Sequence, residues 1–160
     1  MKINIEKELF TLKNEILDAV PDIIAETAVE YFQDTFRKKA FDGAPWPNFS
    51  PGYRHRTNGS LLIDSAALLN SVRPSLISRD LVIISAGNEK VPYARAHNEG
   101  FVGSVVVPAH KRTSKKGKAY SVKQHSMSMR LPQRQFLGDA KELQQQLHYR
   151  IEGFINSLNK

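Results

Sequence analysis

The sequence contains no cysteine and no long apolar run, and it has no acidic residue between Glu99 and Asp139. Without cysteine the chain forms neither disulfides nor thiolate metal sites, which is compatible with a reducing cytoplasm. No stretch approaches the roughly 20 apolar residues of a membrane-spanning helix. The N-terminal sequence MKINIEKELF carries charges where a signal peptide has its apolar core. We therefore expect neither a secretion signal nor a membrane partner.

The acid-free segment holds the charge that makes the chain basic. It contains eight Lys and Arg residues, whereas the whole chain has 23 basic and 16 acidic residues and a net charge of +7. Outside the segment, 15 basic residues (23 − 8) face 16 acidic ones, a net charge of −1. Positive charge concentrated in one segment is typical of a surface that meets phosphate groups or an acidic partner.

Two regions have the spacing of amphipathic helices. Residues 1–40 repeat apolar side chains three and four positions apart, and we expect Pro21 to interrupt this helix. Asp22 is then the expected cap of a second helix. Residues 139–158 show the same spacing, so a final helix is expected there with Asp139 as its cap.

Residues 41–138 carry mainly strand patterns. Two strands are expected over 72–78 and 81–86, joined by a turn at Arg79-Asp80. The nearly continuous apolar run LVIIS predicts that the second of them is a central strand. Three more elements are expected: a short helix over 64–71 capped by Asp64, a helical turn over 92–99 closed by Gly100, and a strand over 101–107.

This order of elements predicts an α+β fold in one domain over residues 1–160. We expect an antiparallel sheet of about four strands, with the N-terminal helices and the C-terminal helix packed on it. A long basic β-hairpin or loop arm is expected over 105–130, with residues 109–118 at its tip and Val105–Val107 facing Ser121-Val122. An isolated hairpin is marginally stable in water, so this arm would gain order by pairing with a neighbouring subunit.

The arm has three interpretations from its residues. Its cations would neutralise DNA phosphates without reading sequence, or bind an acidic protein partner, or only keep an exposed loop soluble. Tyr120 is the one aromatic residue among them, which argues against a single-strand binder that stacks bases. The cations that would form this partner- or DNA-binding surface are Lys111, Arg112, Lys115, Lys116, Lys118 and Lys123.

Sequence motifs of enzymes are missing. The five histidines form no HExxH or HxH pair, and there is no GxSxG, phosphate loop or GxGxxG. His97 and Glu99, with Arg95 before them, are the one candidate acid–base pair. The alternative is that His97 and Asn98 satisfy backbone groups where the helical turn meets Gly100, and the sequence favours this alternative. We expect no catalytic residue, no metal and no cofactor.

The segment LPQRQFLG (131–138) predicts a connection between the arm and the last helix. Pro132 favours extended backbone, and Phe136 and Leu137 are apolar enough to anchor in a core. Gly138 then breaks the strand before the helix. Arg134 is expected to face away from the two apolar anchors.

Four short motifs in this order resemble the phage virion morphogenesis or tail-completion family, which includes proteins of Mu-like phages. They are Trp46-Pro47, LLIDSAALLNS (61–71), YARAHNEG (93–100) and LPQRQFLG. The chain departs from the family pattern at Ser65, at Asn98-Glu99, and at the glutamines on either side of Arg134. The residues of these motifs that we expect to form a scaffold are Trp46, Leu68, Tyr93, Ala94, His97, Gly100, Pro132, Arg134, Phe136, Leu137 and Gly138.

The resemblance implies a structural, non-enzymatic protein of the virion, made in the cytoplasm of the bacterial host. Such proteins finish the tail or join it to the head, commonly as a ring at the neck. The implied partners are other copies of the chain, the tail-tube, tail-terminator or connector proteins, and packaged DNA facing the arm. The alternative function, from the residues alone, is a small nucleic-acid-binding protein that uses the loop over 111–123.

Overall fold

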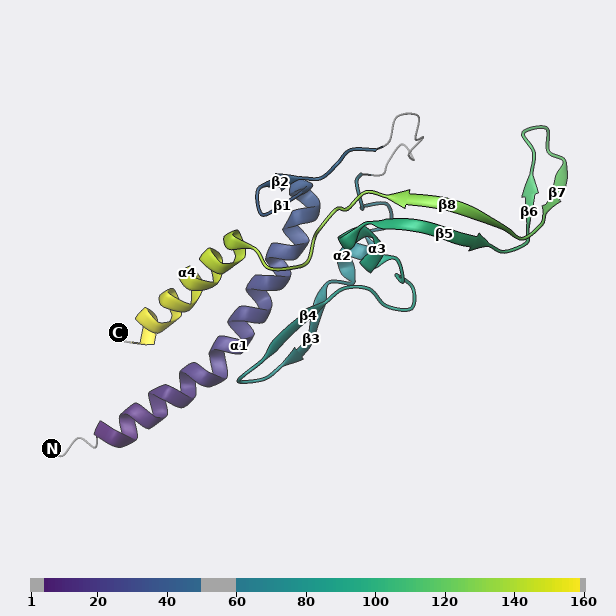
Figure 1. The fold of residues 1–160 in the computed structure, drawn as a ribbon. Coiled ribbons are helices and arrows are strands. Elements are labelled where there is room, and N and C mark those ends of the chain that lie inside the picture. Colours follow the sequence, from purple (N-terminus) through teal and green to yellow (C-terminus); the bar gives the residue numbers. More distant parts are fainter. Residues whose placement is uncertain (1–4, 50–59, 159–160) are drawn as a thin grey trace.

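The computed structural model describes residues 5–49 and 60–158, and its architecture is α+β. Helix α1 (Ile5–Lys38) is the longest element, and α4 (Lys141–Leu158) packs beside it (Figure 1). Two short helices, α2 (Ala67–Asn70) and α3 (Ala94–Glu99), lie between the strands. The expected α+β class is therefore confirmed, but the two long terminal helices pack against each other rather than together on one sheet.

The strands of the described residues form four separate two-stranded antiparallel sheets, so the expected single sheet of about four strands is wrong. They pair as β1 (Ala40–Phe41) with β2 (Ala44–Pro45), β3 (Arg73–Ile77) with β4 (Val82–Ser85), β5 (Phe101–Val107) with β8 (His125–Leu131), and β6 (His110–Thr113) with β7 (Ala119–Val122).

The physical reason lies in the edges of the ribbons. Pro74 in β3 has no N–H to donate to a third strand, and the β3–β4 register shifts between Pro74 and Leu76. Both features disfavour the addition of another strand to β3. The apolar run in β4 therefore does not mark a central strand. Ile84 packs against the core, whereas Leu81 and Ile83 are 52% and 42% exposed. The hairpin itself and its turn at 79–80 are confirmed, with Ser78 N–H donating to Leu81 O at 2.9 Å.

Helix α1 runs through Pro21 without a break, so the expected interruption there and the cap at Asp22 are wrong. A proline inside a helix removes one backbone hydrogen bond and crowds the preceding turn. Here Pro21 is buried, and it lines a groove of about 250 Å³ between α1 and the β3–β4 turn. Apolar packing along the following turns, at Ala25, Ala28 and Phe32, stabilises the helix on the C-terminal side of the proline.

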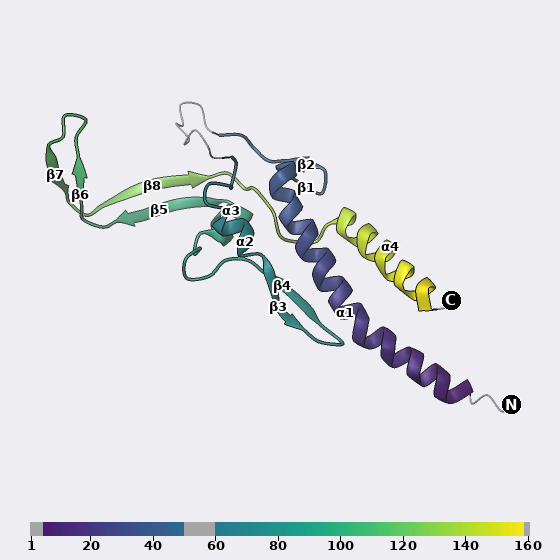
Figure 2. The ribbon, with the colours of Figure 1, turned by 180° about the vertical axis from the view of Figure 1, so that it is seen from behind.

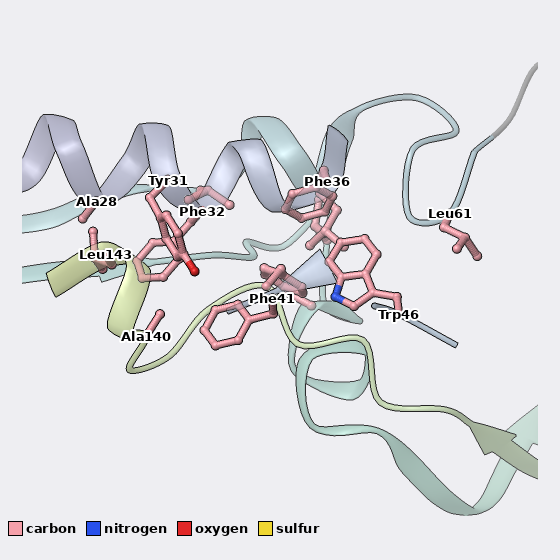
Figure 3. Close-up of a cluster of buried hydrophobic side chains, with 14 residues drawn as sticks. Ala28, Tyr31, Phe32, Phe36, Phe41, Trp46, Leu61, Ala140 and Leu143 are labelled. Atoms are coloured by element: carbon pink, nitrogen blue, oxygen red, sulfur yellow. The ribbon is translucent and has the colours of Figure 1, made fainter. Parts of the chain in front are cut away.

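An aromatic cluster forms the centre of the core (Figure 3). Phe36 at the end of α1 is fully buried, and its ring lies 5.5 Å from Trp46 at 89° and 5.0 Å from Phe136 at 45°. The first pair has the edge-to-face geometry that is favourable for aromatic rings, and the second is tilted. Because Phe136 and Trp46 come from distant parts of the chain, this cluster fixes the end of α1, the 46–49 loop and the 132–138 segment together.

Two expected helix caps are also wrong. The residue before α2 is Ala66, with left-handed backbone (φ 58°), rather than Asp64. The first turn of α4 is capped from a distance, because Glu142 N–H donates to Asp42 Oδ1 at 3.0 Å. Asp139 instead accepts a hydrogen bond from the Gln144 side chain at 2.8 Å. Asp42 reaches α4 from the Asp42-Gly43 turn between β1 and β2, where both residues have positive φ (46° and 79°).

The cap at Asp42 makes stability depend on pH. The backbone N–H groups of Glu142 and then Lys141 lower the pKa of Asp42 below its ordinary value, because they stabilise the charged carboxylate. Because the pKa of Asp42 is lower in the folded protein, the cap contributes fully to stability at pH values above the ordinary Asp pKa of about 4. Its contribution is lost as the pH falls through the lower folded value.

We predict that Asp42→Ala lowers Tm at pH 7 and flattens the fall of Tm between neutral and acidic pH. The measurement is thermal unfolding followed by circular dichroism across that range. Asp139→Ala is the matched control, because its carboxylate contacts only a side chain of the helix. An Asp42→Ala protein with unchanged Tm and an unchanged pH profile would contradict the cap.

Candidate functional site: the basic arm and its base

The arm is a double hairpin that projects from the body. The β5–β8 ribbon leads away from α1, and the β6–β7 ribbon turns off its far end (Figures 1 and 2). The expected facing of Val105–Val107 and Ser121-Val122 is wrong, since Val105 pairs with Met127 and Val122 pairs with His110. Pro108 follows β5 and has no N–H to continue the first ladder, so the tip forms a second ladder of its own.

The cations of the arm are presented by an ordered turn. Ser114 organises it: Ser114 N–H donates to Lys118 O at 2.9 Å, and Ser114 Oγ accepts from Lys118 N–H at 3.0 Å. Gly117 takes the left-handed φ of 79° that the turn needs. On the strands below, Arg112 lies opposite Tyr120. Residues 109–118, expected at the tip of the arm, thus include strand β6, and the turn itself is the few residues between β6 and β7.

All six predicted cations are exposed, and none forms an ion pair with another residue in the described part of the chain. Among the described residues their charge is therefore uncompensated. Opposite charge from another molecule would bind there without first breaking an internal pair. The residues are Lys111, Arg112, Lys115, Lys116, Lys118 and Lys123.

One face of the β5–β8 ribbon is apolar. Side chains alternate along a strand, so the cross-strand pairs Phe101–Leu131, Gly103–Met129 and Val105–Met127 share a side. Met127 is 44% exposed, and on the opposite side Val102 is 80% exposed. The ribbon has no third strand among the described residues. Its apolar surface is thus available to another molecule.

Asn98 holds the base of the arm. Its Oδ1 accepts from the backbone N–H groups of Phe136 and Leu137, both at 2.9 Å. Its Nδ2 donates to Leu137 O at 3.1 Å. Asn98 was expected to satisfy backbone groups, and this is confirmed, but the sequence did not identify the segment that it binds. The sequence did contain a hint of this contact. The segment 132–138 was expected to be extended, and extended backbone needs hydrogen-bond partners for its N–H groups, which a nearby Asn side chain can supply.

Gly100 sets the direction in which the arm leaves the body. Helix α3 ends at this glycine, as expected, with a φ of 79°. A Cβ at this position would lie 3.1 Å from Gln133 N and 3.3 Å from Leu131 O. These neighbours are backbone atoms of the returning chain, which have little freedom to move. A side chain would therefore force the two ends of the arm apart.

Arg134 is buried, with 7% exposure. Its Nε donates to Pro47 O at 2.9 Å and its Nη2 donates to Asn48 O at 3.1 Å. Its guanidinium also lies 5.9 Å from the centre of the Phe49 ring. Trp46 Nε1 donates in the other direction, to Gln135 O at 2.6 Å. These contacts fasten the 46–49 loop to the 132–138 segment.

His97 is bound to the same segment through its backbone. His97 O accepts from Arg134 N–H at 2.8 Å, and its ring meets Tyr93 edge to face at 5.7 Å. Burial, and then the positive charge of Arg134, lower the pKa of His97. Glu99 forms an ion pair with Arg95 at 2.9 Å rather than with His97. The candidate acid–base pair is therefore not formed.

The remaining scaffold residues are placed by packing. Leu68 and Ala94 belong to the same buried cluster as Phe136. Tyr93 is 42% exposed, and Pro132 and Leu137 are half-buried. Gly138 has a φ of 149°. The predicted scaffold residues thus gather around the base of the arm, whereas the predicted cations lie at its far end (Figure 1).

Comparison with protein families gives a match over almost the whole chain. Residues 6–155 match the Phage virion morphogenesis family, and the chain belongs to this family. No curated protein and no solved structure matches the chain. Among residues 5–49 and 60–158, no helix is long and apolar enough to cross a membrane, and no group of three or more metal-binding side chains could hold an ion.

We predict that Asn98→Ala destabilises the protein by about 1–3 kcal/mol, because two partly buried backbone N–H groups lose their acceptor. Chemical denaturation of the two proteins measures this difference. Gln133→Ala, at an exposed position in the same segment, is the control and should change stability by less than about 0.5 kcal/mol. Equal loss in both variants would show that Asn98 does not fasten the arm.

Proposed function

We propose that this chain is a non-enzymatic structural protein of the virion that completes the tail or joins it to the head. We further propose that it acts as a ring of identical subunits. Membership of the Phage virion morphogenesis family supports a role in building the particle. The observation that carries the finer proposal is the arm, a projecting double hairpin with uncompensated positive charge.

The arm has the physical character of an assembly element. A two-stranded ribbon in water is marginally stable alone, and this one leaves both its outer edges and an apolar face without a partner strand in the described structure. Pairing with a further molecule would supply the missing contacts. A compact body with a firmly attached arm can contact a neighbouring subunit through two different surfaces, which is a heterologous contact. Such contacts close into a ring when a whole number of subunit rotations adds up to a full turn.

The base of the arm supports a structural rather than a chemical role. The polar groups of Asn98, Arg134 and Trp46 are used in hydrogen bonds that fasten one segment to another. Glu99 is used in an exposed ion pair. The motif residues thus hold an element in place. The proposed partners of the chain are other copies of itself, tail-tube, tail-terminator or connector proteins, and packaged DNA.

We predict that a phage carrying a nonsense mutation in this gene accumulates DNA-filled heads and unattached or incomplete tails. Electron microscopy of lysates is the measurement, with the wild-type gene supplied from a plasmid as the control. The purified protein, alone and with the tail-tube protein, should sediment as a species larger than a monomer. Normal infectious particles from the mutant, or a strict monomer that ignores tail and connector proteins, would contradict the proposal.

A further inference from the structure

The N-terminal half of α1 carries a stripe of carboxylates. Glu8, Glu15, Asp22 and Glu26 are separated by seven, seven and four residues, which places them along one side of the helix. All four are exposed, and none forms an ion pair in the described part of the chain. Residues 5–26 contain six acidic and two basic side chains.

An apolar stripe lies beside these carboxylates. Ile5, Leu9, Leu12 and Ile16 follow the four-three-four spacing of a helix that packs on another element. Leu12 lies between Glu8 and Glu15 on the helix surface, at i+4 and i−3. Ile5 and Leu9 are 66% and 59% exposed, and the neighbouring Phe10 is 67% exposed. Large apolar side chains gathered in this way mark an interaction site.

The figures place this surface at the opposite end of the molecule from the arm. The first turns of α1 extend past α4 and past the β3–β4 hairpin in both views (Figures 1 and 2). The arm extends from the other end. One end thus combines apolar side chains with uncompensated negative charge, and the other combines apolar side chains with uncompensated positive charge.

We infer that the arm of one copy binds the N-terminal half of α1 of a second copy, with its apolar ribbon face against Ile5, Leu9 and Leu12 and its cations beside the carboxylate stripe. This inference rests on the proposed ring and names its subunit contact. Charge complementarity selects the second copy as the partner. Because the two surfaces lie at opposite ends, each copy uses its arm toward one neighbour and its helix toward the other. Such a head-to-tail contact extends beyond a dimer.

The contact has a definite dependence on salt. Exposed charges more than about 8 Å apart are screened at physiological ionic strength, so the carboxylates and cations steer the copies together most strongly at low salt. The apolar faces supply the attraction that persists at high salt. Self-association should therefore weaken as salt is added without disappearing.

The test uses two charge-reversed full-length proteins. The arm-reversed protein carries Lys111→Glu, Lys115→Glu and Lys118→Glu, and the helix-reversed protein carries Glu8→Lys, Glu15→Lys and Asp22→Lys. Each keeps one surface and reverses the other, so each should self-associate about tenfold or more weakly than wild type. An equal mixture should regain assembly, because the acidic arm of one meets the basic helix of the other.

Sedimentation at several salt concentrations measures the outcome, and circular dichroism checks that each variant is folded. Arg73→Glu with Lys90→Glu reverses exposed charges outside both surfaces and is the matched control, expected to assemble as wild type does. Restored assembly to species larger than a dimer, in the mixture alone, supports the inference.

The other outcomes overturn it in distinguishable ways. A wild-type protein that stays monomeric would contradict the proposed ring itself. Normal assembly of the arm-reversed protein would exclude the arm as the subunit contact but would not contradict the ring. If that same protein also lost salt-dependent binding to a short DNA duplex, the partner of the arm would be DNA. A mixture that stays monomeric, or stops at a dimer, would contradict the head-to-tail arrangement.

Discussion

The hydrogen bonds that Asn98 Oδ1 accepts from the backbone N–H groups of Phe136 and Leu137 are the constraint on which the position of the arm depends. A two-stranded ribbon has no core of its own, so its direction is set where its two ends enter the body. One end follows Gly100 and the other passes Pro132 into the core at Phe136, whose ring packs on Phe36. Asn98 holds these two ends together over a separation of about 40 residues in the chain. The end of α1 is thereby connected to the base of the arm through the contact of Phe36 with Phe136.

Arg134 shows how a motif residue that looks functional serves structure. It was expected to face away from the apolar anchors Phe136 and Leu137. In the structure it is buried and donates to the carbonyls of Pro47 and Asn48. A buried cation needs such partners, because removing it from water is costly unless its donors are satisfied. The planar guanidinium supplies several donors in a fixed geometry, which a lysine would not. Its role is to hold a loop that lacks regular structure against the segment that carries the arm.

Local elements could be predicted from the sequence, whereas their long-range contacts could not. The β3–β4 hairpin, the turn of α3 closed by Gly100 and the C-terminal helix follow from spacing and turn residues alone. The continuity of α1 through Pro21 does not, because it depends on packing by residues distant in sequence. Asp42 lies 100 residues from Glu142 in the sequence, so no local sequence pattern predicts that it caps this helix. The division of the strands into four ribbons was not predicted because it also depends on long-range contacts. The alternation of apolar residues along a strand does not show which other strand it pairs with. The spacing of the scaffold residues in the sequence does not show that they surround one junction, and only their contacts in the structure do.

The absence of acidic residues from Gly100 to Gly138 now has a physical consequence for assembly. A carboxylate within the arm would pair with a neighbouring lysine across the ribbon, since opposite charges on facing strands attract. The pair would cancel the charge inside one subunit and leave less of it to attract a partner. The carboxylates of the chain lie instead on the helices and loops outside the arm, including the stripe on α1. Opposite charges kept apart within one subunit can meet only between molecules. A near-neutral body with a positively charged arm is therefore arranged for association, and the N-terminal half of α1 carries charge of the opposite sign.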